Sequence, residues 1–127
     1  MYIFRFPARV PLMTYGGLTD WISKGRDPLR RKIGTTVTVD RADVPERHIC
    51  IYLYDTIIAR LYPDGRVIVS EAVNNWPRQA TTEWLALILW NNGLSGHVGR
   101  EGGRYRQAGQ IFTAGEPRPA RWQEVAA

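Results

Sequence analysis

Two neighbouring residues of this 127-residue chain could support nucleophilic chemistry. Cys50 follows His48 by two positions, so on a strand both side chains would project from one face, as a thiol and its base would. A cysteine inside a strand is more often a small core residue, and no neighbouring charge indicates a lowered pKa. We therefore predict no catalytic residue and no enzyme activity.

Metal-ligating residues are equally sparse. The chain has a single cysteine, Cys50, and two isolated histidines, His48 and His97, which show none of the usual spacings of metal ligands. Carboxylates such as Asp55 or Glu71 would have to converge on them. We predict no metal, no cofactor and no internal disulfide.

A basic segment is the strongest candidate for function, since five of its nine residues are cations and one is an acid. Gly25 and Pro28 predict an exposed loop, where cations could meet a phosphate backbone without reading sequence. A solvated loop without a partner is the alternative interpretation. The cations are Lys24, Arg26, Arg30, Arg31 and Lys32. If the predicted C-terminal hairpin lies nearby, it would extend this surface with Arg100, Arg104 and Arg106.

The distribution of charge supports this interpretation weakly. The formal net charge is +5, and it divides into +4 over residues 1–47, −1 over 48–96 and +2 over 97–127. A basic exterior favours phosphate-bearing partners and argues against an acidic mimic of DNA.

Aromatic residues offer two further hypotheses. Tyr52 and Tyr54 alternate along a predicted strand, as bases stacking on a sheet would require, although half-buried packing is the commoner role of such a pair. Alternatively, a protein partner could bind an interface that includes Trp84, Trp90 or Trp122.

The middle of the chain predicts a three-stranded antiparallel meander over residues 48–70. The segment 48–54 alternates between apolar and other residues, and residues 57–62 and 66–70 are rich in strand formers. Between the last two, Pro63-Asp64-Gly65 has the residue types of a tight turn.

A helix is predicted over about residues 81–92. Thr81 or Thr82 would cap it, Glu83 would lie in its first turn, and Gly93 would end it. Residues 84–90 are apolar on every face, so the rest of the chain, a second subunit or a partner must cover this helix.

The remaining segments complete an α+β prediction: a sheet of about five to seven strands, with one main helix on one face. We expect an edge strand at 2–6, a strand at 35–39, and a loop over 11–34 with at most one helical turn around 19–23. Short strands joined by glycine turns follow over 97–113. Residues 1–115 would form one domain, followed by an extended proline-rich tail over 116–127.

A set of short motifs resembles a loose group of small uncharacterised proteins from bacteriophages and actinobacterial mobile elements. The matching residues are a strand of the form Tyr-x-Thr-x-Ile, Tyr54–Ala59, then Asp64–Val67, Trp76 and Thr81-Thr82. The chain departs from the group at Asn75, where a glycine often precedes the tryptophan. The resemblance implies a phage-borne, cytoplasmic accessory protein made inside a bacterial host. The group has no known activity that the resemblance could assign to this chain.

The longest apolar run has seven residues, Trp84–Trp90, far fewer than the ~20 that a membrane span needs. The first residues lack the charged leader and apolar stretch of a secretory signal. We therefore expect a cytoplasmic, non-enzymatic protein that binds nucleic acid, or a complex containing it, through basic loops. The alternative is an inhibitor or modulator that binds a host or defence protein and that could act as a homodimer.

Overall fold

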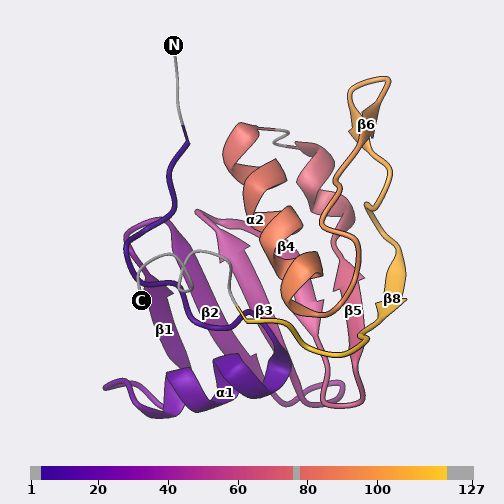
Figure 1. Cartoon of the computed structure of the whole chain (residues 1–127). Coiled ribbons are helices and arrows are strands. Elements are labelled where there is room, and N and C mark those ends of the chain that lie inside the picture. Colours follow the sequence, from indigo (N-terminus) through magenta and orange to yellow (C-terminus); the bar gives the residue numbers. More distant parts are fainter. Residues whose placement is uncertain (1–3, 76–77, 120–127) are drawn as a thin grey trace.

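A six-stranded antiparallel sheet forms the centre of the protein, seen in a computed structural model that describes residues 4–75 and 78–119 (Figure 1). Its strands run in the order β1-β2-β3-β4-β5-β8. Their bounds are β1 Arg30–Ile33, β2 Val37–Ala42, β3 His48–Leu53, β4 Thr56–Leu61, β5 Arg66–Val69 and β8 Ile111–Thr113. A separate two-stranded sheet pairs β6 (Arg100–Glu101) with β7 (Arg104–Tyr105).

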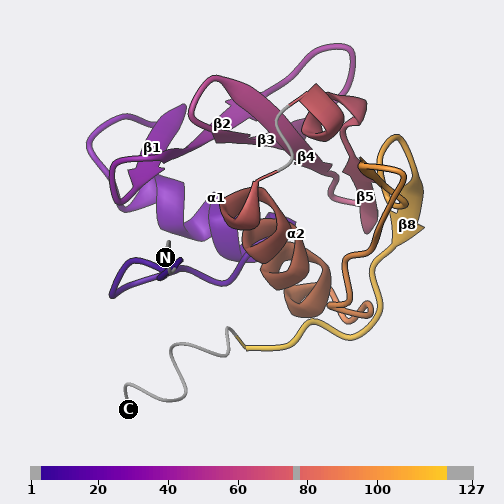
Figure 2. The ribbon, with the colours of Figure 1, turned by 90° about the horizontal axis from the view of Figure 1, so that it is seen from above.

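Both α-helices, α1 (Tyr15–Ser23) and α2 (Gln79–Asn91), lie on the same face of the six-stranded sheet, as Figure 2 shows. A short 3-10 helix, η1 (Glu71–Asn75), connects β5 to α2. The fold is therefore α+β with one main helix, as predicted. The core is built from alternate strand residues and from residues of both helices, including Val39, Ile51, Ala59, Val69, Leu18, Ile22, Trp84 and Ile88.

The predicted meander over residues 48–70 is confirmed as β3, β4 and β5. The turn after β4 closes where the Gly65 amide donates to the Tyr62 carbonyl, with Gly65 at a φ of 95°. One irregularity was not expected: the register between β3 and β4 shifts at Ile51/Tyr52, where a bulge adds a residue to β4.

The chain itself covers the side of α2 that faces away from the sheet, so this apolar helix needs no partner to bury it. Figure 2 shows the N-terminal segment and the segment after β8 passing beneath the helices. The rings of Phe4 and Phe6 contact Trp84 edge-on, with centroids 6.5 and 4.9 Å away. At the other end of α2, the Arg118 guanidinium lies 4.1 Å from the Trp90 ring centroid.

Two buried asparagines at the end of α2 fix the N-terminal segment in place. The Met13 amide donates to Asn91 Oδ1 at 2.8 Å, and Asn92 Nδ2 donates to the Met13 carbonyl at 2.9 Å. Met13 lies in an irregular segment before α1, so its backbone N–H and C=O have no partner in a strand or helix. The two asparagine side chains supply those hydrogen bonds. Residues 115–118 are tied to the same helix end by amides donating to the Asn92 and Asn91 carbonyls.

Three expectations for the N-terminal part of the chain were wrong. Residues 4–6 of the expected edge strand form no strand, because Phe4 and Phe6 instead pack on α2; residues 2 and 3 lie outside the described residues. The expected loop over 11–34 contains α1 and β1. Helix α1 forms despite its glycines because Thr14 caps it and because Leu18 and Ile22 are buried against the sheet.

The start of α2 also differs from the expectation. The helix begins at Gln79, two residues earlier than expected, and Arg78 is its N-cap without a side-chain cap bond. Thr81 is therefore buried inside the helix, and the Thr82 hydroxyl contacts the Tyr105 hydroxyl at 2.8 Å rather than capping a terminus. Glu83 lies beyond the first turn. Within the part of the chain described, neither helix is long and apolar enough to span a membrane.

Candidate nucleic-acid interface

The five cations of the basic segment do not share one surface, because three of them lie in β1 and not in a loop. Side chains alternate along a strand, so Arg31 projects toward the helices while Arg30 and Lys32 project from the opposite face. The Arg31 guanidinium lies 4.4 Å from the Trp21 ring centroid and donates to the Trp21 carbonyl. Arg31 therefore fastens β1 to α1.

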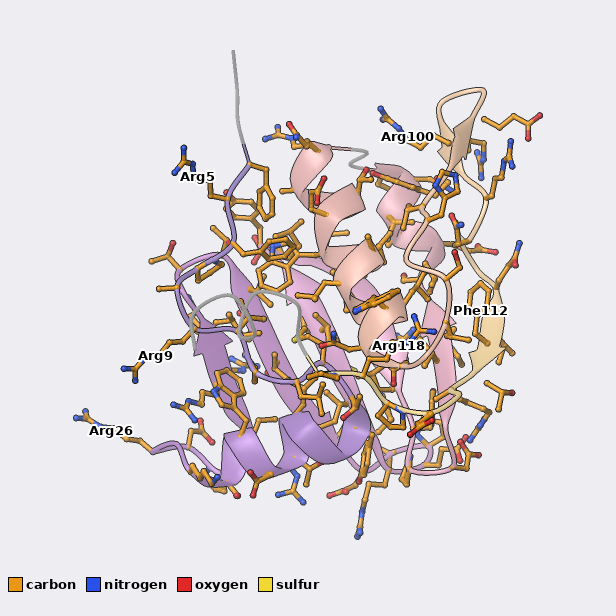
Figure 3. All side chains as sticks on the ribbon, viewed as in Figure 1. Arg5, Arg9, Arg26, Arg100, Phe112 and Arg118 are labelled. Atoms are coloured by element: carbon orange, nitrogen blue, oxygen red, sulfur yellow. The ribbon has the colours of Figure 1, made fainter. Side chains whose placement is uncertain are left out.

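The other cations of this segment differ in their partners. Lys24 pairs with Asp20 at 3.0 Å, on the exposed surface of α1. Arg26 is exposed at the corner of the molecule beside α1 (Figure 3). Arg26 and Lys32 form no ion pair within residues 4–75 and 78–119.

The second group of predicted cations, Arg100, Arg104 and Arg106, lies on the β6–β7 hairpin and does not extend the basic segment. Figure 3 places Arg100 at the corner of the molecule diagonally opposite Arg26. Arg106 pairs with Glu101 at 3.5 Å, and Arg100 lies 5.8 Å from the Tyr105 ring centroid. The hairpin is thus a separate basic surface.

The face of the sheet opposite α1 and α2 carries a third group of cations, and we call it the open face. Val39, Ile51 and Ala59 are paired and fully buried on the helix side, so the residues between them in each strand point outward. One outward row crosses all six strands; from β1 to β8 its members are Arg30, Asp40, Cys50, Arg60, Ile68 and Ile111.

The strand residues of the open face include four cations and one acid. By the register these are Arg30, Lys32, Arg60 and Arg66, and the single carboxylate is that of Asp40. Arg30 donates to both oxygens of Asp40, at 2.7 and 3.1 Å. The strand residues of the open face therefore carry a net positive charge. The loops that join β2 to β5 are acidic, with one cation, Arg47, and four acids, Asp43, Glu46, Asp55 and Asp64.

Arg66 is oriented by neighbours at the lower end of the open face. Its guanidinium lies 4.3 Å from the Tyr62 ring centroid and pairs at 2.8 Å with both Glu46 and Asp64. The backbone N–H of Arg66 donates a hydrogen bond to the Asp64 carboxylate, and this bond lowers the pKa of Asp64. A hydrogen bond from the Arg66 guanidinium lowers the pKa further. Arg66 is therefore held in one orientation, with two carboxylates balancing its charge.

The Cys50 and His48 pair is not arranged for nucleophilic catalysis. Burial raises the pKa of the Cys50 thiol, and the nearby Arg60 opposes that rise without reversing it. His48 Nδ1 donates to the Glu46 carbonyl at 2.7 Å, and its ring stacks on Tyr62. In the described chain no three His, Cys, Asp or Glu side chains converge in a way that could hold a metal.

A shallow depression of about 280 Å³ lies on the open face, beside the β3–β4 turn. Burial raises the pKa of Tyr52, which forms its floor on β3. Tyr54 lies in the turn with 59% of its surface exposed and a φ of 53°. The residues lining the depression are Arg30, Thr38, Asp40, Tyr52, Tyr54 and Asp55.

The tryptophans predicted for a protein interface are not gathered on one exposed surface. Trp84 is completely buried beneath Phe4 and Phe6, so a partner cannot reach it in this fold. Trp90 is half-buried against Arg118. Trp122 lies outside the described residues.

Sequence reasoning did not single out Arg60 and Arg66, which complete the open face. The turn at 63–65 pairs residue 61 with residue 67, and this pairing places Arg60 and Arg66 outward. Alternation carried from β3 through the two-residue turn at 54–55 would have placed Arg60 on the helix side, and the bulge at Ile51/Tyr52 reverses this, so the alternation did not identify it.

No protein-family model, no curated protein and no solved structure matches this chain. The resemblance to phage and mobile-element proteins therefore stays a prediction.

Proposed function

We propose that this protein binds single-stranded nucleic acid on the open face of its sheet. The observation that carries the proposal is the composition of that face: four cations and one acid among the strand residues, on a side that neither α-helix covers (Figure 2). Contacts to phosphate supply most of the affinity of such proteins and carry no sequence information.

The cations are spaced so that a bound strand would run across the sheet. Lys32 lies on β1 and Arg60 on β4. Neighbouring strands are about 4.8 Å apart, so the two cations are separated by about 14 Å in this direction. Tyr52, on β3, lies between them. By the register, Tyr52 is in the row of Lys32 and Cys50 is in the row of Arg60, so a strand with its phosphates on both cations would cross the sheet beside this ring.

Two features favour a single strand over a duplex. Tyr52 and Tyr54 offer rings on which only unpaired bases can stack, because a duplex keeps its base faces covered. The open face also carries no helix that could enter a major groove, since α1 and α2 lie on the other side (Figure 2).

Fluorescence anisotropy with a labelled 16-nucleotide single strand of mixed sequence, and with the corresponding duplex, tests the proposal. Arg30 and Arg66 are already paired with carboxylates, so we count Lys32 and Arg60 as the phosphate contacts. Two contacts give a slope of about −1.4 in log affinity against log salt, or about 7-fold weaker binding at 200 mM than at 50 mM salt. We expect tighter binding of the single strand. Absence of binding at 50 mM salt would overturn the proposal and favour the alternative prediction of a protein partner.

Charge-changing variants locate the contact. Lys32→Glu and Arg60→Gln should each weaken binding of the single strand about 5-fold or more. Arg104→Glu on the β6–β7 hairpin is the matched control, and its affinity should stay within 2-fold of the parent. If Arg104→Glu weakens binding more than Lys32→Glu and Arg60→Gln do, the nucleic acid binds the hairpin and the proposed role of the open face is wrong.

A further inference from the structure

The depression on the open face has the size and walls of a site for one flat ring. Its volume of about 280 Å³ lies just below the ~300 Å³ at which pockets for drug-sized ligands begin. Two aromatic residues, Tyr52 and Tyr54, are among its lining residues. It opens on the same face, and beside the same cations, on which the proposed function rests.

Tyr54 is the first residue of the two-residue turn between β3 and β4, a position at which the favoured hairpin turns need a positive φ. Its φ of 53° is left-handed, which is uncommon for a bulky residue and costs about 1 kcal/mol or more. With 59% of its surface exposed, the ring recovers little of that cost by burial. Glycine or asparagine would suit this turn better. Strained residues of this kind are concentrated at binding sites.

Asp55 is the acidic residue of the depression that has no ion pair within residues 4–75 and 78–119. Both oxygens of Asp40 accept N–H groups from Arg30, which keeps three of its five N–H donors. The hydroxyls of Thr38 and the two tyrosines can donate or accept. The Asp55 carboxylate is an acceptor only, so it can bind an N–H donor on the edge of a ligand but not a carbonyl oxygen.

We propose, on the basis of the proposed function, that the depression holds one unpaired base that carries an exocyclic amino group. The base stacks on Tyr54, and its amino group donates to Asp55, as cytosine donates to carboxylates in protein–DNA complexes. Cytosine and adenine present such a donor. Thymine and uracil present carbonyl oxygens at the corresponding position and meet the carboxylate with repulsion.

Binding of the labelled 12-nucleotide homopolymers of deoxycytidine, deoxyadenosine and deoxythymidine at 50 mM salt tests this proposal. We expect the cytidine and adenosine strands to bind at least 5-fold more tightly than the thymidine strand. Asp55→Asn adds an amide donor for carbonyls, so it should bring the three affinities within 2-fold of one another. Salt dependence should be unchanged, because Asp55 contacts no phosphate in this account.

Tyr54→Gly separates stacking from folding. The variant removes the left-handed strain, so its melting temperature should equal or exceed that of the parent. Its affinity for the cytidine strand should fall about 5-fold or more, whereas Tyr54→Phe, which keeps the ring, should stay within 2-fold.

The outcomes distinguish this proposal from the proposed function. Equal, salt-dependent binding of all three homopolymers, or full affinity in Tyr54→Gly, would overturn the base site and leave the proposed function standing. Failure of all three strands to bind would overturn both.

Discussion

Adjacent side chains of this protein have opposite roles, because strand alternation directs them to opposite faces of the sheet. Arg31 and Lys32 are consecutive cations of β1. Arg31 contacts the Trp21 ring and carbonyl on the helix side, while Lys32 is exposed on the open face. From composition alone, both residues would be predicted to bind phosphate. Their different roles follow from the alternation of side chains along β1.

These roles predict that a variant of Arg31 loses stability but not affinity, and that a variant of Lys32 loses affinity but not stability. Arg31→Ala should lower the free energy of unfolding by about 1–2 kcal/mol, since it removes a cation–π contact and a hydrogen bond, and should leave affinity for a single strand within 2-fold. Lys32→Ala should do the reverse, weakening binding about 3-fold or more and changing stability by less than about 0.5 kcal/mol. Urea denaturation and anisotropy measure the two quantities. Equal losses of affinity in both variants would contradict the assignment.

At the scale of elements, the covering of α2 explains how an all-round apolar helix exists in a single chain. Phe4 and Phe6 cover one end, and the segment around Arg118 covers the other. Gly93 allows that second segment to approach: its φ is 74°, and a Cβ there would collide with the backbone of Glu116.

Gly93→Ala should therefore lower the free energy of unfolding by about 2–3 kcal/mol, from left-handed strain together with overpacking. Gly102→Ala is the matched control. Gly102 also has a positive φ, of 58°, but an added Cβ would have no neighbour within 4 Å, so only about 1 kcal/mol should be lost. Equal losses in the two variants, measured by urea denaturation, would show that the segment does not pack on α2 as described.

The elements that sequence predicts well are those whose local pattern and tertiary role agree. The meander over 48–70 has alternation, β-branched residues and a turn in agreement, and it forms as predicted. Helix α1 was missed because Gly16 and Gly17 lower its local propensity, while its stability comes from burying Leu18 and Ile22. Strand β1 was missed because its charged residues suit a loop equally well until β2 pairs with them.

The candidate site was predictable in kind but not in place. Cations and alternating tyrosines were visible in the sequence, and both bear on the proposed interface. Which cations gather depends on the register, which brings Arg30, Arg60 and Arg66 to one face and turns Arg31 away. The depression needs the left-handed turn at Tyr54, which no local sequence rule predicts for a tyrosine.

At the scale of the whole molecule, the two faces of the sheet have different tasks. One face buries the core against α1 and α2, and the other carries the cations and the depression (Figure 2). The net charge of +5 does not describe this asymmetry, because it also counts cations such as Lys24, which pairs with Asp20, and Arg31, which stacks on Trp21.

Backbone amide chemical shifts, recorded by NMR during titration with a cytidine 12-nucleotide strand, test the central claim most directly. The account predicts that the largest shifts fall on β1 to β5 and on the turn at Tyr54, with those of α1 and of the β6–β7 hairpin unchanged. Shifts centred on the hairpin or on the 24–29 segment, with the sheet unperturbed, would contradict it.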